Sequence, residues 1–75
     1  MERLADCKVG QNKKIVRIDP KAPIKIRRRL LELGWTNGQR VKILRRSFFG
    51  QTFLIEIRFF CLSVRKNLAE YVFVE

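Results

Sequence analysis

The stretch RRLLELGWTNGQRVKIL, residues 28–44, passes from one kind of local structure to another. Its leucines continue an apolar stripe at helical spacing, which predicts a helix over residues 24–33. Gly34 fits the position just past a helix end, and Asn37-Gly38 indicates a tight turn because both residues tolerate positive φ. Apolar and basic residues then alternate over residues 40–45. The stretch therefore predicts a helix that turns directly into a strand.

The segment before this stretch starts the helix and supplies a first strand. Pro23 fits a first helical position. The apolar stripe of the predicted helix comprises Ile26, Leu30 and Leu33. Residues 14–19 partly alternate, so we expect a strand in which Val16 and Ile18 face inward and Arg17 faces outward.

The segment after the stretch predicts three further strands. Residues 53–59 alternate most clearly, and this predicts that Phe53, Ile55, Ile57 and Phe59 share the inward face. Two more strands are expected at residues 62–64 and 72–74, separated by a short helical turn within residues 65–71. Short strands joined by tight turns favour an all-β fold: a small β-barrel of about five strands with one α-helix inserted after the first strand.

The composition indicates one small domain, residues 1–75, with a strongly basic charge. Seventeen Lys and Arg against seven Asp and Glu give a net charge of +10, which favours nucleic acid, an anionic membrane surface or an acidic protein face as partner. No apolar run approaches the roughly 20 residues of a membrane span, and the opening residues predict no signal peptide. Cys7 and Cys61 are far apart, so we expect reduced thiols in a cytoplasmic protein, with a disulfide as the alternative.

The sequence offers little material for catalysis or metal binding. It has no histidine, so it has no histidine-based acid–base pair or metal site. The acidic residues are scattered, and the four glycines form no phosphate-binding loop. We therefore expect a protein that is not an enzyme and that has no cofactor and no metal site. The alternative for a transition metal is a zinc ion shared by cysteines of two chains.

Candidate partner-binding residues stand in RRSFFGQTF, residues 45–53. Adjacent side chains of an extended chain point in opposite directions, so Phe48 and Phe49 cannot both enter one core. With Arg45 and Arg46 as a basic rim, these rings have the composition of a recognition surface. A second candidate group is the helical arginine run, Arg27, Arg28 and Arg29.

Each candidate also has another interpretation. The arginine run can be a solvated helix face whose stems cover apolar surface. The loop phenylalanines, together with Phe60 and Arg58, would suit a nucleic-acid-binding barrel that stacks bases on aromatic rings. Apolar hairpin tips could also join two copies in a homodimer. Trp35 is expected to cap the core at the helix exit.

Two segments together resemble the FeoA domain. The first, residues 28–44, matches it in Arg29, Leu30, Leu33, Gly34, Gly38, Val41 and Ile43. The second, residues 61–75, matches it in Leu62, Val64, Arg65, Ala69, Val72 and Val74. The resemblance implies an SH3-like β-barrel and a cytoplasmic accessory protein of bacterial ferrous iron uptake. It also implies protein–protein interaction with FeoB, a membrane transporter that carries a cytosolic G domain.

Overall fold

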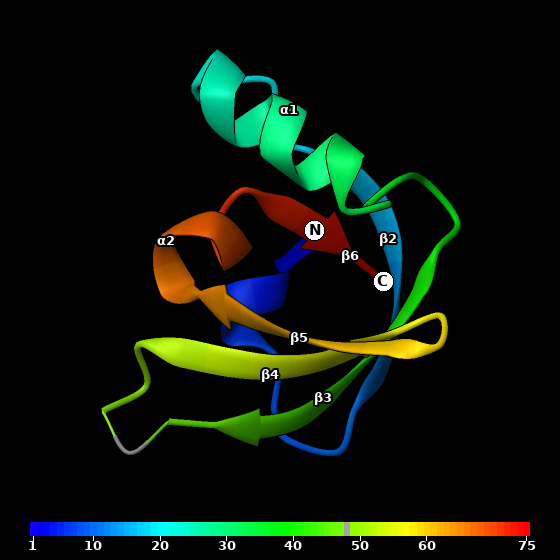
Figure 1. Ribbon diagram of the computed structural model, residues 1–75, viewed down its shortest axis with the longest axis vertical. Helices are drawn as coiled ribbons and strands as arrows, with labels where there is room; N and C mark the ends of the chain where they lie inside the picture. Colours follow the sequence, from blue (N-terminus) through cyan, green and yellow to red (C-terminus); the bar gives the residue numbers. More distant parts are fainter. Residues whose placement is uncertain (48) are drawn as a thin grey trace.

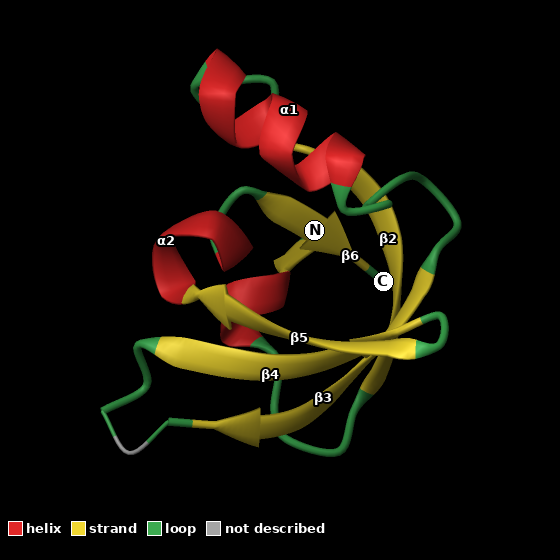
Figure 2. Ribbon diagram, in the orientation of Figure 1, coloured by secondary structure: helices red, strands yellow, loops and turns green. Residues whose placement is uncertain are grey.

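The computed structural model describes residues 1–47 and 49–75. The elements along the chain are β1 (Glu2–Arg3), the 3-10 helix η1 (Leu4–Asp6), β2 (Asn12–Ile18), α1 (Ile24–Glu32), β3 (Arg40–Arg46), β4 (Thr52–Ile57), β5 (Phe60–Arg65), α2 (Lys66–Ala69) and β6 (Val72–Val74). Every strand pair is antiparallel, in the order β1-β6-β2-β3-β4-β5. The sheet curls around a central core, and α1 lies at one end of the long axis (Figure 1, Figure 2). Within the described residues, the helices are too short and too polar to span a membrane.

The architecture confirms the predicted all-β barrel with an inserted α-helix. All five expected strands form, and α2 lies within the segment where a short helical turn was expected. The difference is β1, a strand of two residues that pairs with β6. The helix α1 therefore follows the second strand and not the first. Two residues cannot show an alternating pattern, so β1 exists only because β6 lies beside it.

The end of α1 brings Trp35 into the core. The Gly34 N–H donates to the Leu31 carbonyl oxygen, and the Trp35 N–H donates to the Leu30 carbonyl oxygen, both at 3.0 Å. These are the two bonds of a Schellman motif, and the φ of +86° at Gly34 is a conformation that favours glycine. Leu30 and Trp35 are 1% and 0% exposed and belong to one apolar cluster. The expected core position of Trp35 is confirmed.

One contiguous cluster forms the core, and it draws residues from η1, α1, α2 and five of the strands. The stripe residues Ile26 and Leu33 pack against it from α1, as expected. Its buried members are Leu4, Ala5, Cys7, Ile15, Leu30, Trp35, Val41, Ile43, Phe53, Ile55, Ile57, Val64, Ala69, Val72 and Val74. Most of the cluster joins residues distant in sequence, so the fold depends on long-range packing.

Strand β2 presents a different residue to the core from the one predicted. Ile15 is completely buried, whereas Val16 is only half-buried, so the inward prediction for Val16 is wrong. Between Ile15 and Arg17 the pairing advances by two residues on β2 but by one on β6. Val16 is therefore the extra residue of a β-bulge, which interrupts the period of two. Ile18 still packs against the core and Arg17 is exposed, as expected.

Strand β4 ends earlier than predicted. It stops at Ile57, which pairs with Phe60, so Arg58 and Phe59 form a two-residue turn. Phe59 is 98% exposed, and the prediction that it faces inward is wrong. Arg58 adopts a φ of +54° at a position where hairpins usually have glycine or asparagine. Because neither residue type marks this turn, the alternation appeared to continue through it.

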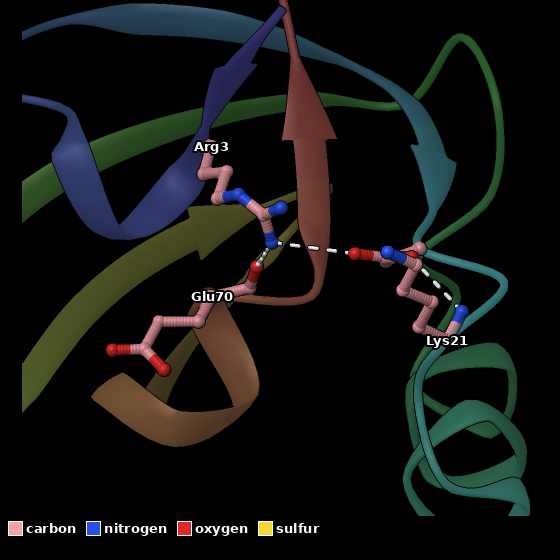
Figure 3. A network of polar contacts seen from close by, with 4 residues as sticks. Arg3, Lys21 and Glu70 are labelled. Atoms are coloured by element: carbon pink, nitrogen blue, oxygen red, sulfur yellow. Dashed lines mark hydrogen bonds and ion pairs between the residues drawn. The ribbon is translucent and has the colours of Figure 1, made fainter.

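A polar network connects the N-terminal strand to two distant segments (Figure 3). The Arg3 Nη1 donates to Asp19 Oδ2 at 3.3 Å and to the Glu70 carbonyl oxygen at 2.5 Å. The Lys21 N–H donates to Asp19 Oδ1 at 2.9 Å. Asp19 is only 6% exposed, so its charge needs these donors. The network therefore joins β1, the segment before α1 and the end of α2.

We predict that Asp19→Ala lowers the free energy of unfolding by about 1–3 kcal/mol, because Arg3 and the Lys21 N–H lose a shared acceptor. Urea unfolding followed by Trp35 fluorescence measures the change. Glu32→Ala removes an exposed carboxylate from α1 and serves as the control, with an expected change within about 0.5 kcal/mol. Equal losses in the two variants would contradict the role of the network.

The two cysteines occupy different environments. Cys7 follows η1, is 0% exposed, and has its Sγ 3.6 Å from the Arg3 carbonyl oxygen. Burial, followed by the negative charge of Glu2, raises the pKa of Cys7 from 9.0 to about 11. Cys61 is exposed on β5, and both thiols are free. The structure therefore contains no Cys7–Cys61 disulfide.

We predict that iodoacetamide at neutral pH modifies Cys61 long before Cys7, since Cys7 is shielded and fully protonated. The pKa of the Cys7 thiol is higher in the folded protein than in the unfolded chain. Between pH 9.0 and about 11, Cys7 therefore stays protonated in the folded protein but loses its proton in the unfolded chain. Its stabilising contribution is therefore present below pH 9.0 and is lost as the pH rises toward about 11. Mass spectrometry after timed alkylation measures both rates, and Cys61→Ser isolates Cys7. In that variant, alkylation as fast without urea as with it would refute the shielding.

Candidate functional site

The most exposed aromatic side chains among the described residues lie at two hairpin tips. Phe49, in the β3–β4 connection, is 81% exposed. Phe59 and Phe60, at the β4–β5 turn, are 98% and 64% exposed. Figure 1 shows these two connections at opposite ends of β4. The two tips are therefore separate candidate surfaces.

Ser47 makes several hydrogen bonds at the β3–β4 connection. The Ser47 Oγ accepts from the Gln51 N–H at 3.0 Å and from the Thr52 N–H at 3.1 Å. The Gly50 N–H donates to the Ser47 carbonyl oxygen at 2.8 Å, with Gly50 at a φ of +69°. These bonds join the end of β3 to Gly50, Gln51 and the start of β4, next to the exposed Phe49. The predicted contact residue Phe48 lies outside the described residues.

The two arginines beside this tip have different surroundings. The guanidinium of Arg46 stands over the Phe53 ring, 4.9 Å from its centroid, and donates to the Ala5 carbonyl oxygen at 3.4 Å. Arg46 thus covers one end of the barrel core. Arg45 follows a β-bulge in β3 and is exposed. The Arg46 Nε also lies 3.7 Å from where a side chain at Gly50 would begin, so both exposed arginines are candidates for a basic rim beside Phe49.

The helical arginines form a separate surface. Arg27, Arg28 and Arg29 are all exposed along α1. In Figure 1, α1 and the β3–β4 connection lie at opposite ends of the molecule. The structure therefore does not bring the arginine run together with Phe49 and Arg45, and it creates two distinct basic regions.

The β4–β5 turn is the feature that the sequence analysis underestimated. The side chain of Arg58, in this turn, reaches the residue before β3: the Arg58 Nε donates to Gln39 Oε1 at 2.9 Å. This leaves Phe59 and Phe60 projecting beyond the barrel. The available signal was the second adjacent pair of phenylalanines, which has the same character as the pair at residues 48–49.

A shallow groove of about 280 Å³ lies next to this turn, between the end of α1 and strand β5. The Arg58 side chain lies across its end, with the guanidinium carbon 3.6 Å from where a side chain at Gly34 would begin. The groove is lined by Glu32, Leu33, Gly34, Ile57, Arg58, Phe60 and Leu62. Its surface is largely apolar and contains one carboxylate and one guanidinium, a lining suited to apolar side chains of a partner.

The described residues gather no set of metal ligands. Within residues 1–47 and 49–75, no three cysteine, aspartate or glutamate side chains lie close enough together to hold a metal ion. Cys7 is buried in the core, whereas Cys61 is exposed on β5.

Comparison with known proteins identifies the family. The sequence matches the FeoA domain over residues 2–75. Among solved structures, the FeoA protein of Chlorobium tepidum is 29% identical with a TM-score of 0.86, and the match covers 97% of this chain and 68% of that one. A FeoA-like protein of Clostridium acetobutylicum is 26% identical with a TM-score of 0.88, over 100% and 88% of the two chains.

A third solved structure, FeoA of Stenotrophomonas maltophilia in complex with zinc, is 25% identical with a TM-score of 0.87, over 100% of this chain and 91% of that one. That protein is described as a prokaryotic SH3 domain protein and a candidate activating factor for ferrous iron transport. No curated protein matches the sequence. The SH3-like barrel is therefore shown both by the strand arrangement and by its structural relatives. With a match across nearly its whole length, this chain belongs to the FeoA domain family.

Proposed function

We propose that this protein is a non-catalytic cytoplasmic accessory protein of bacterial ferrous iron uptake that acts by binding the transporter FeoB. Membership of the FeoA domain family supports the link to ferrous iron transport. The activating role described for the Stenotrophomonas relative is consistent with regulation of a transporter. The absence of histidine and of nucleotide-binding motifs in the sequence favours a binding role over a catalytic one.

The observation that carries the proposal is the 81% exposure of Phe49 in the β3–β4 connection. An aromatic side chain has only two rotatable bonds, so it loses little conformational freedom when a partner buries it. Burying a phenylalanine side chain contributes roughly 1.5–3 kcal/mol. Phe49 therefore has the properties of an interface anchor.

The exposed Arg45 and the net charge of +10 indicate which kind of partner surface would bind. An exposed guanidinium at the rim of an apolar contact attracts an acidic surface and speeds the encounter. The surface we expect on the cytosolic G domain of FeoB is thus an apolar pocket with acidic residues at its edge. A second basic contact stays a prediction. It would use Arg27, Arg28 and Arg29 to bind another part of the partner or anionic lipid headgroups.

We predict that Phe49→Ser weakens capture of the FeoB G domain by about tenfold to a hundredfold, because the anchor ring is lost. Val9→Ser is the matched control: it removes an apolar side chain that is 55% exposed between η1 and β2, and should bind as the wild type does. Pull-down and titration calorimetry give the two affinities. A second comparison uses the pair Phe48→Ser/Phe49→Ser.

Equal capture of the G domain by wild type and the Phe49→Ser variant would exclude the tip as the anchor. Titration of a labelled single-stranded oligonucleotide tests the alternative function. Tight, sequence-tolerant binding with a steep salt dependence would favour the nucleic-acid-binding barrel over the transporter partner.

We predict that Arg45→Ala slows association with the G domain and flattens its dependence on salt, while dissociation changes little. The reason is that a rim charge acts mainly through long-range attraction. Stopped-flow measurements at several ionic strengths provide both rates. Arg28→Ala is the comparison, because it also removes one exposed charge but from α1, at the other end of the molecule. An equal loss in that variant would mean that net charge alone determines the rate.

A further inference from the structure

Strand β5 has an edge with which no other described strand pairs. It is the last strand of the sheet and pairs only with β4. At one end of β5, Phe60 pairs with Ile57 across the two-residue turn. Just past the other end, Lys66 pairs with Gln51, and the Lys66 N–H donates to the Gln51 carbonyl oxygen at 2.8 Å. These two pairs fix which β5 residues bond to β4, because bonded pairs alternate along an antiparallel ladder.

The alternation directs the backbone groups of Cys61 and Ser63 away from β4. Phe60, Leu62 and Val64 stand opposite Ile57, Ile55 and Phe53 at the hydrogen-bonded positions. Within residues 1–47 and 49–75, no backbone hydrogen bond joins Cys61 or Ser63 to another element. Both residues are exposed. Their N–H and C=O groups are therefore available to another strand.

This edge lacks the usual features that prevent pairing. Exposed edges commonly carry lysine, proline or a bulge, or they are very short. Residues 60–64 have no charged side chain and no proline, and the β4–β5 pairing runs without a register shift. At the other end of the sheet, β1 has only two residues and offers little to pair with. Of the two edges of the described sheet, the β5 edge is therefore the one that is long and has no feature that prevents pairing.

An apolar groove runs beside the same edge. Phe60 and Leu62 line it from β5, and Leu33 lines it from the end of α1. A strand added to β5 would place alternate side chains over this groove while its backbone bonds to Cys61 and Ser63. A free edge next to an apolar groove is the arrangement that binds extended peptides by strand addition.

We propose that the β5 edge binds an extended segment of another protein as an added strand, with alternating apolar side chains over the groove and acidic residues at its ends. The basic ends of the site are Arg58, beside the turn, and Arg65, at the end of β5. Glu32 is the acidic residue of the lining, so acidic partner residues belong at the two ends and not over the groove.

Charge also argues against a second copy of this chain as the occupant. Two molecules that each carry +10 repel one another, whereas an acidic segment is attracted. The groove lies at the β4–β5 turn, at the opposite end of β4 from the β3–β4 connection that carries Phe49, whereas Arg65 pairs with Thr52 at the end of that connection (Figure 1). The groove is therefore a second surface, separate from the proposed FeoB anchor. A protein with both sites could connect two partners or two separate segments of one partner.

The test uses a synthetic peptide of alternating valine and threonine with aspartates at both ends, titrated against the full-length protein. Ser63→Pro removes the outward N–H and obstructs the added strand, but it breaks no bond to β4. We expect this variant to lose about tenfold or more in affinity. Ser63→Ala keeps the N–H and should bind as the wild type does. Thermal unfolding of both variants verifies that the barrel is intact.

A direct readout does not depend on any variant. Peptide binding should protect the amide hydrogens of Cys61 and Ser63 from exchange, because these groups become hydrogen-bonded. Phe60→Ser should weaken binding through loss of groove contact, whereas Phe49→Ser should not. The same peptide with lysines in place of the aspartates should bind about tenfold more weakly.

Three outcomes would overturn the proposal: equal binding by the Ser63→Pro and Ser63→Ala variants, no amide protection at Cys61 and Ser63, or a stable homodimer that Ser63→Pro converts to monomer. The last result would make a second copy the occupant. Because Phe49→Ser and Phe60→Ser act on different surfaces, loss of FeoB capture and loss of peptide binding can be scored separately. Failure of one proposal is thereby distinguishable from failure of the other.

Discussion

The end of α1 is the constraint on which the rest of the structure depends. Two backbone hydrogen bonds and the left-handed Gly34 reverse the chain and insert Trp35 into the core, where it is 0% exposed. Burial of the apolar surface of Trp35 favours this insertion, and a hydrogen bond does not, because Trp35 Nε1 is buried with no hydrogen-bond partner among the described residues. A domain of this length has one core, so the position of Trp35 determines where α1 and its exposed arginines stand.

The candidate binding surfaces lie where the barrel leaves aromatic side chains exposed. Bulges in β2 and β3 and a two-residue turn after β4 interrupt the regular alternation. Each interruption changes which side chain faces solvent: Val16 leaves the core, Arg46 covers Phe53, and Phe59 projects from the turn. The result is two aromatic tips at opposite ends of β4. This arrangement suits a small protein that binds more than one partner surface.

Local chemistry predicted much of the fold. The helix with its stripe, the Gly34 stop and the five longer strands were recognisable, because they depend on neighbours within a few residues. The prediction was wrong for Val16 and Phe59, where a bulge and an unmarked turn interrupt the pattern. Of the predicted contact residues, Phe49 is exposed in the β3–β4 connection and Arg45 is exposed near the end of β3, whereas the α1 arginines stand apart. Separation of that kind depends on how distant elements pack and has no local signal.

By itself, the sequence determined the fold class, the basic charge and the resemblance to the FeoA domain, since composition and short-range spacing carry all three. Tertiary structure alone decided which aromatics are exposed and which strand edge is free. The strand order β1-β6-β2-β3-β4-β5 arises from pairing between residues far apart in the chain, and it leaves β5 as the open edge beside the end of α1. Exposure is a property of that arrangement: Phe53 and Phe59 belong to one alternating run, yet Phe53 is 0% and Phe59 is 98% exposed.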